Sequence, residues 1–351
     1  MKNLLIQACI ILILVGRAFA QEEETTSTSS PLVFSGSADI YYKYDFAGMP
    51  NISTSFANDH NSFSLGMFNL IATKEIGKAS FVADIGMGPR NASSVGPSEI
   101  ELQPGIQNLY ISYEFTDKLS MIAGYMGTFV GYEVISPTGN FNYSTSYLFT
   151  NGPFQNAGLK VKYAFSDMAS LMVGIFDDWN VYQQTPGIEL STYGAQLTIS
   201  PVEGWDAYFN FISGKSNGME LDLTTGYQIT DQFYLGLNAA TWKYALDASN
   251  DAKFSGAALY AQFAASDAVS IGLRGELFNT ENTGYIGTGI ISGVEAKGVT
   301  AFTLSANIGG GALKFIPEFR VDKASENVFM DGNLNETTTA MQFLGALVFS
   351  F

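Results

Sequence analysis

The chain has 351 residues, of which 14% are charged, 14% are aromatic and 36 are glycine. Its 33 acidic residues outnumber 17 basic ones. The formal net charge of −16 excludes nucleic acid as a partner, because phosphate binding needs clusters of Lys and Arg. A charged fraction well below the roughly 25% of soluble domains also argues against an ordinary soluble enzyme.

The first twenty residues are predicted to be a secretory signal peptide. Lys2 supplies the positive start, residues 4–15 are mainly apolar, and residues 18–20 form a small-x-small cleavage site. The apolar run is too short for a transmembrane helix, which needs about 20 such residues. Cleavage would remove the single cysteine, Cys9, so we expect neither disulfides nor thiol chemistry. It would leave 15 basic residues against 33 acidic ones, a net charge of −18.

Residues 21–31 are acidic and then rich in Ser and Thr, and are expected to form a short disordered leader. The remaining domain, 32–351, contains no run of about 18 apolar residues that could form a membrane helix. Instead, apolar residues recur at every second position over stretches of about 10 residues. Trp205, Ala207 and Phe209, for example, alternate with more polar neighbours. Because only helices and closed barrels satisfy every backbone polar group in a membrane, this pattern predicts an all-β transmembrane barrel.

Sixteen antiparallel strands are predicted, with fourteen as the alternative. They cover approximately 32–46, 61–74, 78–88, 105–115, 118–128, 154–165, 168–180, 189–200, 204–214, 218–229, 232–244, 253–264, 267–278, 296–308, 311–322 and 338–351. Short turns, several of them Ser-Asp or Thr-Asp, alternate with mostly longer polar loops, as periplasmic turns and extracellular loops do in outer-membrane barrels. Within 61–74 the alternation loses its phase, which indicates a bulge.

The last strand ends in a pattern typical of barrel assembly. Phe343, Leu347, Phe349 and Phe351 share one face, and Phe351 is the last residue. A terminal aromatic residue preceded by apolar residues at alternate positions resembles the signal that bacterial barrel-assembly machinery reads. We therefore expect that machinery to insert the chain into outer-membrane lipid.

Three stretches resemble a known family beyond this general pattern. They are 36–46 (GSADIYYKYDF), 58–63 (NDHNSF) and 148–154 (LFTNGPF). Together they are similar to the β-barrel porin-2 (OmpL-like) family of outer-membrane proteins in Gram-negative bacteria. The resemblance implies a porin and supplies no catalytic residue. We expect passive diffusion of small hydrophilic solutes and ions, with no enzyme activity, cofactor or bound metal. A homotrimer and a monomer are both compatible with the sequence.

Charged residues on the polar face of the strands are expected to point into the lumen, where they set a channel's selectivity. They are Asp39, Lys43, Asp45, Asp84, Glu114, Lys160, Lys162, Asp206, Glu220, Asp222, Arg274, Glu276, Lys314, Glu318, Arg320 and Asp322. Sixteen strands leave more interior than side chains alone can fill. Because the signs are mixed with an excess of acids, we expect a wet lumen with a modest preference for cations.

The connection 129–153 is the longest and follows the fifth strand, which is the position of the loop that narrows general porins of sixteen strands. It is expected to form a constriction through Phe129, Tyr132, Glu133, Asn140, Phe141, Tyr143 and Tyr147. An external lid or a subunit contact is the alternative. Because Glu133 is the only acidic or basic residue in this loop, the restriction is expected to be mainly steric. Loops usually tolerate change, so its removal is expected to cost little stability.

The sequence also leaves three other functions open. A substrate-selective channel, for example for sugars, would use the aromatic residues as a track and would show block of single channels by its solute. A surface adhesion or scaffold barrel would not conduct ions. An outer-membrane hydrolase would need a nucleophile beside a base. His60, the only histidine, with Asp59 and Ser62 is the candidate, but immediate sequence neighbours rarely have that geometry.

Overall fold

The structure, a computed structural model, describes residues 29–94, 105–247, 250–282 and 297–351. The signal peptide predicted over 1–20 and most of the predicted leader lie outside these residues. The end of that leader is tied to the barrel. The Ser30 amide donates to the carbonyl of Glu75 at 3.1 Å, and Ser29 forms an isolated bridge with Ile76.

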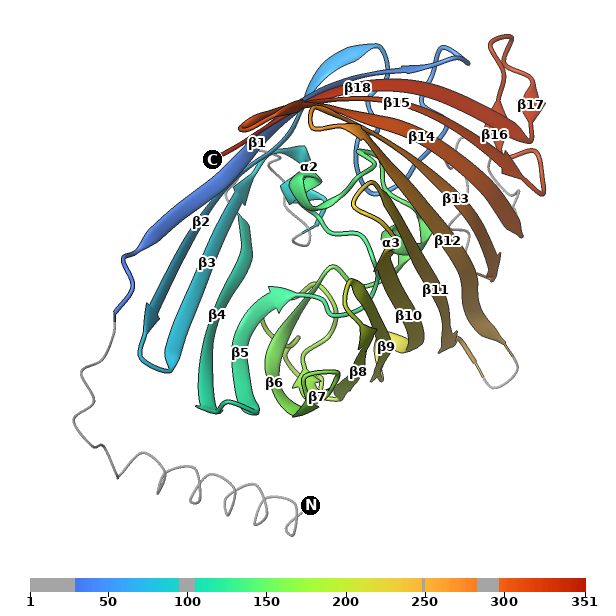
Figure 1. Ribbon diagram of the computed structural model, residues 1–351. Coiled ribbons are helices and arrows are strands. Elements are labelled where there is room, and N and C mark those ends of the chain that lie inside the picture. Colours follow the sequence, from blue (N-terminus) through green and yellow to red (C-terminus); the bar gives the residue numbers. More distant parts are fainter. Residues whose placement is uncertain (1–28, 95–104, 248–249, 283–296) are drawn as a thin grey trace.

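In the described part of the chain, sixteen antiparallel strands close into a barrel in which each strand pairs with its neighbours in sequence and the last pairs with the first (Figure 1). They are β1 (Val33–Asp45), β2 (Ser62–Ile76), β3 (Ala79–Met87), β4 (Gly105–Thr116), β5 (Leu119–Gly127), β6 (Gln155–Ser166), β7 (Ala169–Phe176), β8 (Thr192–Val202), β9 (Trp205–Gly214), β10 (Gly218–Gln228), β11 (Phe233–Ala245), β12 (Asp251–Ser266), β13 (Val269–Glu281), β14 (Gly298–Gly310), β15 (Leu313–Ala324) and β18 (Thr339–Ser350). The predicted sixteen-stranded barrel is confirmed, and the strands match the predicted ranges to within a few residues.

A bulge in β2 explains why the alternation there loses its phase. Ala38 pairs with Phe68 and Ile40 pairs with Leu65, so two residues of β2 lie opposite the single residue Asp39. Both of these β2 residues are buried. The extra residue shifts the inward positions by one along the strand.

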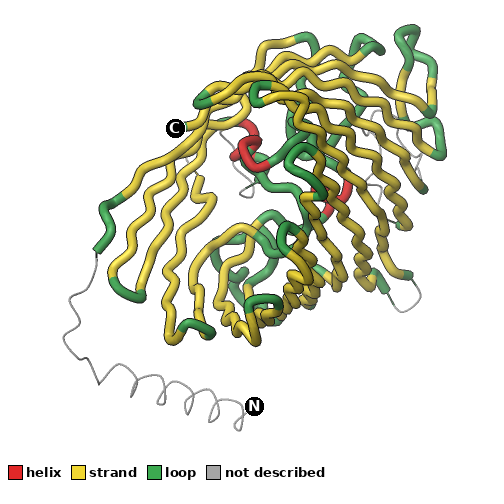
Figure 2. The backbone as a smooth tube through the Cα atoms, in the orientation of Figure 1, coloured by secondary structure: helices red, strands yellow, loops and turns green. Residues whose placement is uncertain are grey.

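The remaining elements lie in the long loops. They are the short helices α2 (Pro89–Ala92) and α3 (Tyr147–Asn151), the 3-10 turn η1 (Pro137–Gly139), and a small hairpin of β16 (Phe329–Met330) and β17 (Glu336–Thr337). Figure 2 shows the helices enclosed by the ring of strands. None of the helices in the described ranges is both long and apolar enough to cross a membrane.

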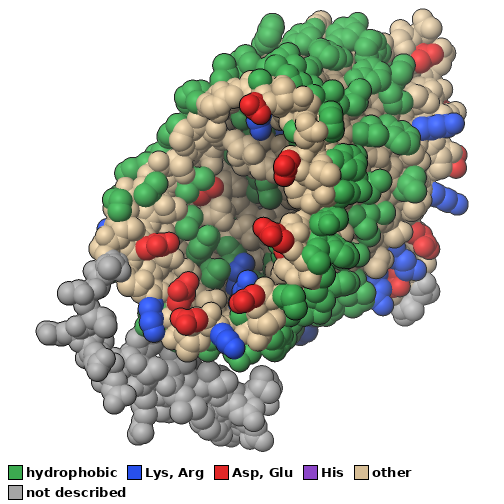
Figure 3. Space-filling model, viewed as in Figure 1, with side chains coloured by type: hydrophobic (Ala, Val, Ile, Leu, Met, Phe, Trp, Pro, Cys, Tyr) green, Lys and Arg blue, Asp and Glu red, His purple; other side chains and the backbone are tan. Residues whose placement is uncertain are grey.

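The outer wall of the barrel is hydrophobic, whereas charged side chains gather around the opening that Figure 3 shows. Outward residues such as Leu273 and Phe302 are about half exposed, which suits contact with lipid. Close to the short turns, rings pair on this wall, as Trp205 does with Tyr227 at 5.7 Å. Such rings form the aromatic girdle expected at a membrane interface.

The last residue closes the seam between β1 and β18. Phe351 and Gly36 exchange two backbone hydrogen bonds, of 3.0 and 3.1 Å. The Phe351 ring covers Gly36 so closely that a Cβ there would lie 2.8 Å from it. Phe343, Leu347 and Phe349, the other residues of the predicted assembly signal, are exposed on the outer face of β18.

Candidate functional site: the lumen and its inward-folded loop

The loop 129–153, which connects β5 to β6, lies inside the barrel against the wall of β10–β15. Two buried glutamates of this wall hold its backbone. Glu276 of β13 accepts the amides of Tyr147 at 3.0 Å and Leu148 at 2.9 Å. Glu318 of β15 accepts the amide of Tyr143 at 2.8 Å and that of the next residue at 3.2 Å. Each glutamate thus binds two successive amides, and these four hydrogen bonds fix the backbone of the loop against the wall.

Two fully buried arginines bind backbone carbonyl groups of the same stretch, whereas the glutamates bind its amides. Arg274 of β13 donates to the carbonyl of Ser144 at 2.7 Å and forms an ion pair with Glu133 at 2.5 Å. Arg320 of β15 donates to the carbonyl of Thr145 at 2.8 Å. The strands β13 and β15 thus each present one Arg and one Glu to the loop, and together these four side chains form what we call the loop clamp.

Two tyrosines of the loop complete the attachment. The Tyr143 hydroxyl donates to Asp39 of β1, and the Tyr147 hydroxyl donates to Asp322 of β15 at 2.8 Å. Burial raises the pKa of both hydroxyls well above its usual range, so both stay protonated as donors. Both residues were predicted to belong to the constriction; both are almost completely buried and anchor the loop to the wall.

Glycines on the inward face of the wall leave room for the aromatic side chains of the loop. A Cβ on any of three glycines would lie 2.2–2.5 Å from a loop ring or its hydroxyl, well under the 3.0 Å that real Cβ contacts keep. The pairs are Gly194 with Phe129, Gly236 with Tyr132, and Gly272 with Phe141. The glycines stand at inward positions in the strand alternation, a sequence signal that the prediction of the constriction did not use.

A second layer, which sequence analysis did not predict, lies over this loop. Arg90 of α2 stands between the rings of Phe56 and Tyr143, with its guanidinium carbon 4.6 Å from each centroid. It donates to the carbonyl of Ile135 at 3.1 Å. The loop 47–60, which contains Phe56, therefore also folds inward. A single Arg in a polar loop that also carries two glutamates is too weak a signal to reveal such a contact.

The predicted lumen charges divide into two groups by exposure. The buried group comprises Asp39, Lys43, Asp45, Asp84, Glu220, Asp222, Arg274, Glu276, Glu318, Arg320 and Asp322. The group that water still reaches comprises Glu114, Lys160, Lys162, Asp206 and Lys314. Glu133 of the loop is also buried, in its ion pair with Arg274. Most of the acidic excess therefore faces protein groups and not the open lumen.

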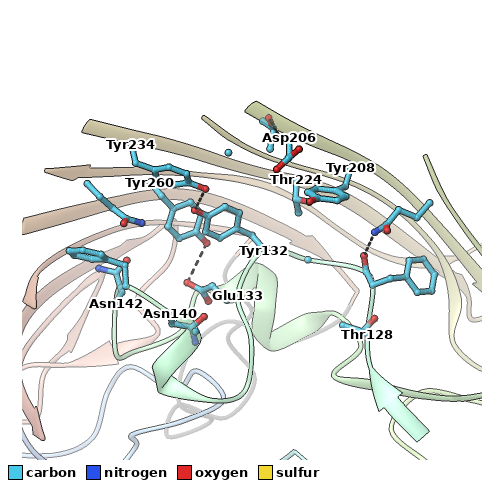
Figure 4. A pocket seen from close by; sticks show the side chains of 18 of the residues that line it. Thr128, Tyr132, Glu133, Asn140, Asn142, Asp206, Tyr208, Thr224, Tyr234 and Tyr260 are labelled. Atoms are coloured by element: carbon cyan, nitrogen blue, oxygen red, sulfur yellow. Dashed lines mark hydrogen bonds between the residues drawn. The ribbon is translucent and has the colours of Figure 1, made fainter. Parts of the chain in front are cut away.

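Beside the loop the lumen keeps open space. A cavity of about 530 Å³ lies between the loop and the wall of β8–β12, with Tyr132 and Asn140 on the loop side and Tyr208 and Thr224 on the wall (Figure 4). A second, of about 610 Å³, extends from the loop toward the short turns and Lys314. A third, of about 220 Å³, separates the loop from β2–β5. The loop thus occupies part of the lumen without filling it.

Solved structures with the same architecture are outer-membrane proteins, among them a channel and a porin. The channel DcaP of Acinetobacter baumannii is 10% identical with a TM-score of 0.65, over 94% of this chain and 99% of that one. An anion-selective porin from Comamonas acidovorans is 14% identical with a TM-score of 0.61, over 92% and 100%. The trimer form of OmpT from Vibrio cholerae is 10% identical with a TM-score of 0.57, over 93% and 100%. At these identities the likeness shows the fold alone. Among curated proteins, none matches this sequence.

The sequence itself matches the family described as "Putative beta-barrel porin-2, OmpL-like" over residues 31–351, which include every strand of the barrel. The chain belongs to this family. The resemblance predicted from three short stretches is confirmed and extends to the last residue. As a β-barrel porin-2 protein, the chain is a porin-like channel barrel of the outer membrane, and porins are not enzymes.

In this β-barrel porin-2 protein the single histidine has no catalytic geometry. His60 accepts a hydrogen bond from the Asp45 amide at 3.0 Å and packs against the ring of Tyr44. Asp59 accepts the hydroxyl of Tyr41 at 2.8 Å, so both groups are tied to β1. Across the described ranges, no group of three or more His, Cys, Asp or Glu side chains is placed to hold a metal ion.

Proposed function

We propose that this β-barrel porin-2 protein lets small hydrophilic solutes and ions diffuse passively through its lumen, with the loop 129–153 as the constriction. The observation that carries the proposal is the loop clamp. It fixes the loop against one wall and leaves polar cavities of about 530 and 610 Å³ beside it. A barrel that served only as an adhesion scaffold would need neither an ordered internal loop nor open space next to it.

The same proposal includes the path to the membrane and the assembly. The signal over 1–20 would be cleaved after export, and the barrel-assembly machinery would insert the mature chain. The trimer form described for OmpT supports a homotrimer for this chain, which cross-linking in native membranes would test.

Reconstitution tests the channel function directly. The purified barrel should produce discrete, ohmic conductance steps in planar bilayers, and liposomes that contain it should swell in isotonic solutions of small neutral solutes. Passive diffusion requires no gating voltage and no energy source, so both signals should appear in a minimal buffer. Membranes that stay sealed despite correctly folded barrel would favour the adhesion or scaffold function.

Ion selectivity should be weakly cationic. The acidic mean field favours cations, but Lys160 and Lys162 form no ion pair with any described residue and stay in contact with water. Replacing both by Gln should therefore raise the cation-to-anion permeability ratio measured by reversal potentials. Lys215→Gln, at an exposed ion pair with Glu189, is the matched control and should change little. A clear anion preference of the wild type would mean that the two lysines dominate the field of the pore.

A further inference from the structure

The 530 Å³ cavity has the composition of a binding site and not only of a passage. Its volume falls within the range of about 300–1,000 Å³ that is typical of small-molecule pockets. Tyrosine rings from the loop and from three strands surround it: Tyr132, Tyr208, Tyr234 and Tyr260 (Figure 4). Between the rings stand amide and hydroxyl side chains, which can donate and accept hydrogen bonds.

Several of these polar groups have no hydrogen-bond partner among the residues that the structure describes. The side chains of Tyr208, Thr224 and Gln262 make no hydrogen bond with any described residue. They lie on three strands of the same wall, β9, β10 and β12. Groups of this kind are available to a ligand that carries several hydroxyls.

The charges of the cavity restrict the class of ligand. None of the described residues that line it is Lys or Arg, which disfavours an anion. Glu133 is neutralised by Arg274 at 2.5 Å. Asp206 alone is a carboxylate without a cationic partner; it accepts the Ser200 hydroxyl at 2.5 Å and keeps lone pairs for further donors.

The loop side of the cavity is rigid before any ligand arrives. The ring of Tyr132 stacks on that of Tyr260 with centroids 4.1 Å apart, and its hydroxyl bonds that of Tyr234 at 3.0 Å. Gly236 and Gly226 leave the space that the hydroxyls of Tyr132 and Tyr234 occupy. Preorganised groups lose little entropy when a ligand binds, so ordering this side of the cavity would cost a bound solute little affinity.

We infer that this cavity is a subsite for neutral, polyhydroxylated solutes, namely mono- and disaccharides, which Tyr208 and Gln262 contact from the wall and Tyr132 from the loop. Sugar rings present apolar C–H faces to aromatic rings while their hydroxyls bond the amides, hydroxyls and Asp206 between them. Asp206 stands next to the short turn between β8 and β9, so the subsite lies on the periplasmic side of the constriction. The inference rests on the proposed channel function for its transport role, but binding itself does not require conduction.

The experiment combines single-channel block in planar bilayers with calorimetry on the detergent-solubilised barrel. The probes are the neutral sugars maltose and glucose, together with gluconate, an anion similar in size to glucose, and glucosamine, a cation similar in size to glucose. Maltose should interrupt the current and bind at millimolar concentration, more tightly than gluconate. Tyr208→Ala with Gln262→Ala should weaken both signals about tenfold, as expected when a ring face and a hydrogen bond are lost. Tyr110→Ala, an inward tyrosine of β4 outside the cavity, should leave both unchanged.

The outcomes separate the subsite from the channel. Steady conductance with neither block nor heat of binding by maltose would overturn the subsite while leaving the channel function intact. Absence of conductance with maltose binding retained would overturn the channel function alone. Tighter binding of gluconate than of maltose would refute the ligand class, and equal maltose binding by the double variant would refute the location.

Discussion

Replacement of residues 133–147 by a short Gly-Ser link is expected to raise the single-channel conductance several-fold and to admit larger sugars. The replaced segment contains Glu133, Phe141, Tyr143 and Tyr147, which fill the lumen beside β11–β15. Without it, the width of the pore would be set by sixteen strands, which enclose an aqueous channel when nothing fills them. Conductance of the variant beside wild type, with liposome swelling in a series of sugars, measures the effect. An unchanged conductance would place the narrowest point elsewhere.

The same variant should also become clearly cation-selective. Removal of residues 133–147 uncovers the loop clamp together with Asp39 and Asp322. Acids outnumber the two arginines among these groups, so water and mobile cations would replace the loop as their partners. A reversal potential that moves toward anions would contradict this account of the clamp.

A point substitution tests the same constriction with less disturbance. Gly272→Leu removes the space of the Phe141 ring, to which a Cβ would approach within 2.2 Å, and should displace the loop and raise conductance. Gly275→Leu on the same strand is the matched control, because a Cβ there would meet Phe302 at an ordinary 3.5 Å on the outer wall. Equal conductance of the two variants would show that Phe141 does not help to hold the constriction.

The expectation that this loop can be removed at little cost in stability considered only contacts on the membrane face. Inside the barrel, the clamp residues are at most 2% exposed and bond the backbone of the loop. A hydrogen bond to a charged group stabilises the folded state by about 1.5–3 kcal/mol even when water can replace the partner. The loop-replaced barrel should therefore unfold at a lower temperature than wild type in heat-modifiability gels, although it remains a barrel.

The second large effect is expected at the last residues of the chain. Substitution of Ser at Phe349 and Phe351 should leave export intact but reduce insertion into the outer membrane several-fold, with accumulation and degradation in the periplasm. The Phe351 ring covers the backbone of Gly36 at the seam between β1 and β18. Its loss would expose the closing hydrogen bonds and remove the proposed signal for the assembly machinery. The amount of heat-modifiable barrel in outer-membrane fractions is the measurement.

A matched control separates the terminal signal from the loss of lipid contact. Phe263 and Phe302 are 45% and 55% exposed on the outer wall, much as Phe349 and Phe351 are. Substitution of Ser at these two positions removes the same apolar area far from the seam. If both double variants lose barrel to the same extent, the effect is general destabilisation and the terminal residues carry no special signal.

Sequence alone determined the barrel and the direction in which most strand residues point, and it favoured sixteen strands over fourteen. The reason is local: lipid and water lie on opposite sides of every strand, so the alternation of Trp205, Ala207 and Phe209 with polar neighbours is readable without any other strand. It even indicated the bulge in β2, because an extra residue disturbs a strict period of two. The prominent loop 129–153 was likewise readable from its length and aromatic content.

Only the tertiary structure decided what the inward charges do. Arg274 faces inward as the alternation predicts, but its partner Glu133 lies 141 positions away along the chain. That contact exists because closure brings the fifth connection against β13, and register sets which side chain it meets. Likewise, Arg90, Gly236 and Gly272 contact aromatic rings of the loop 129–153, which is distant from them in the sequence. Alternation is a property of one strand, whereas the site is a property of the closed barrel.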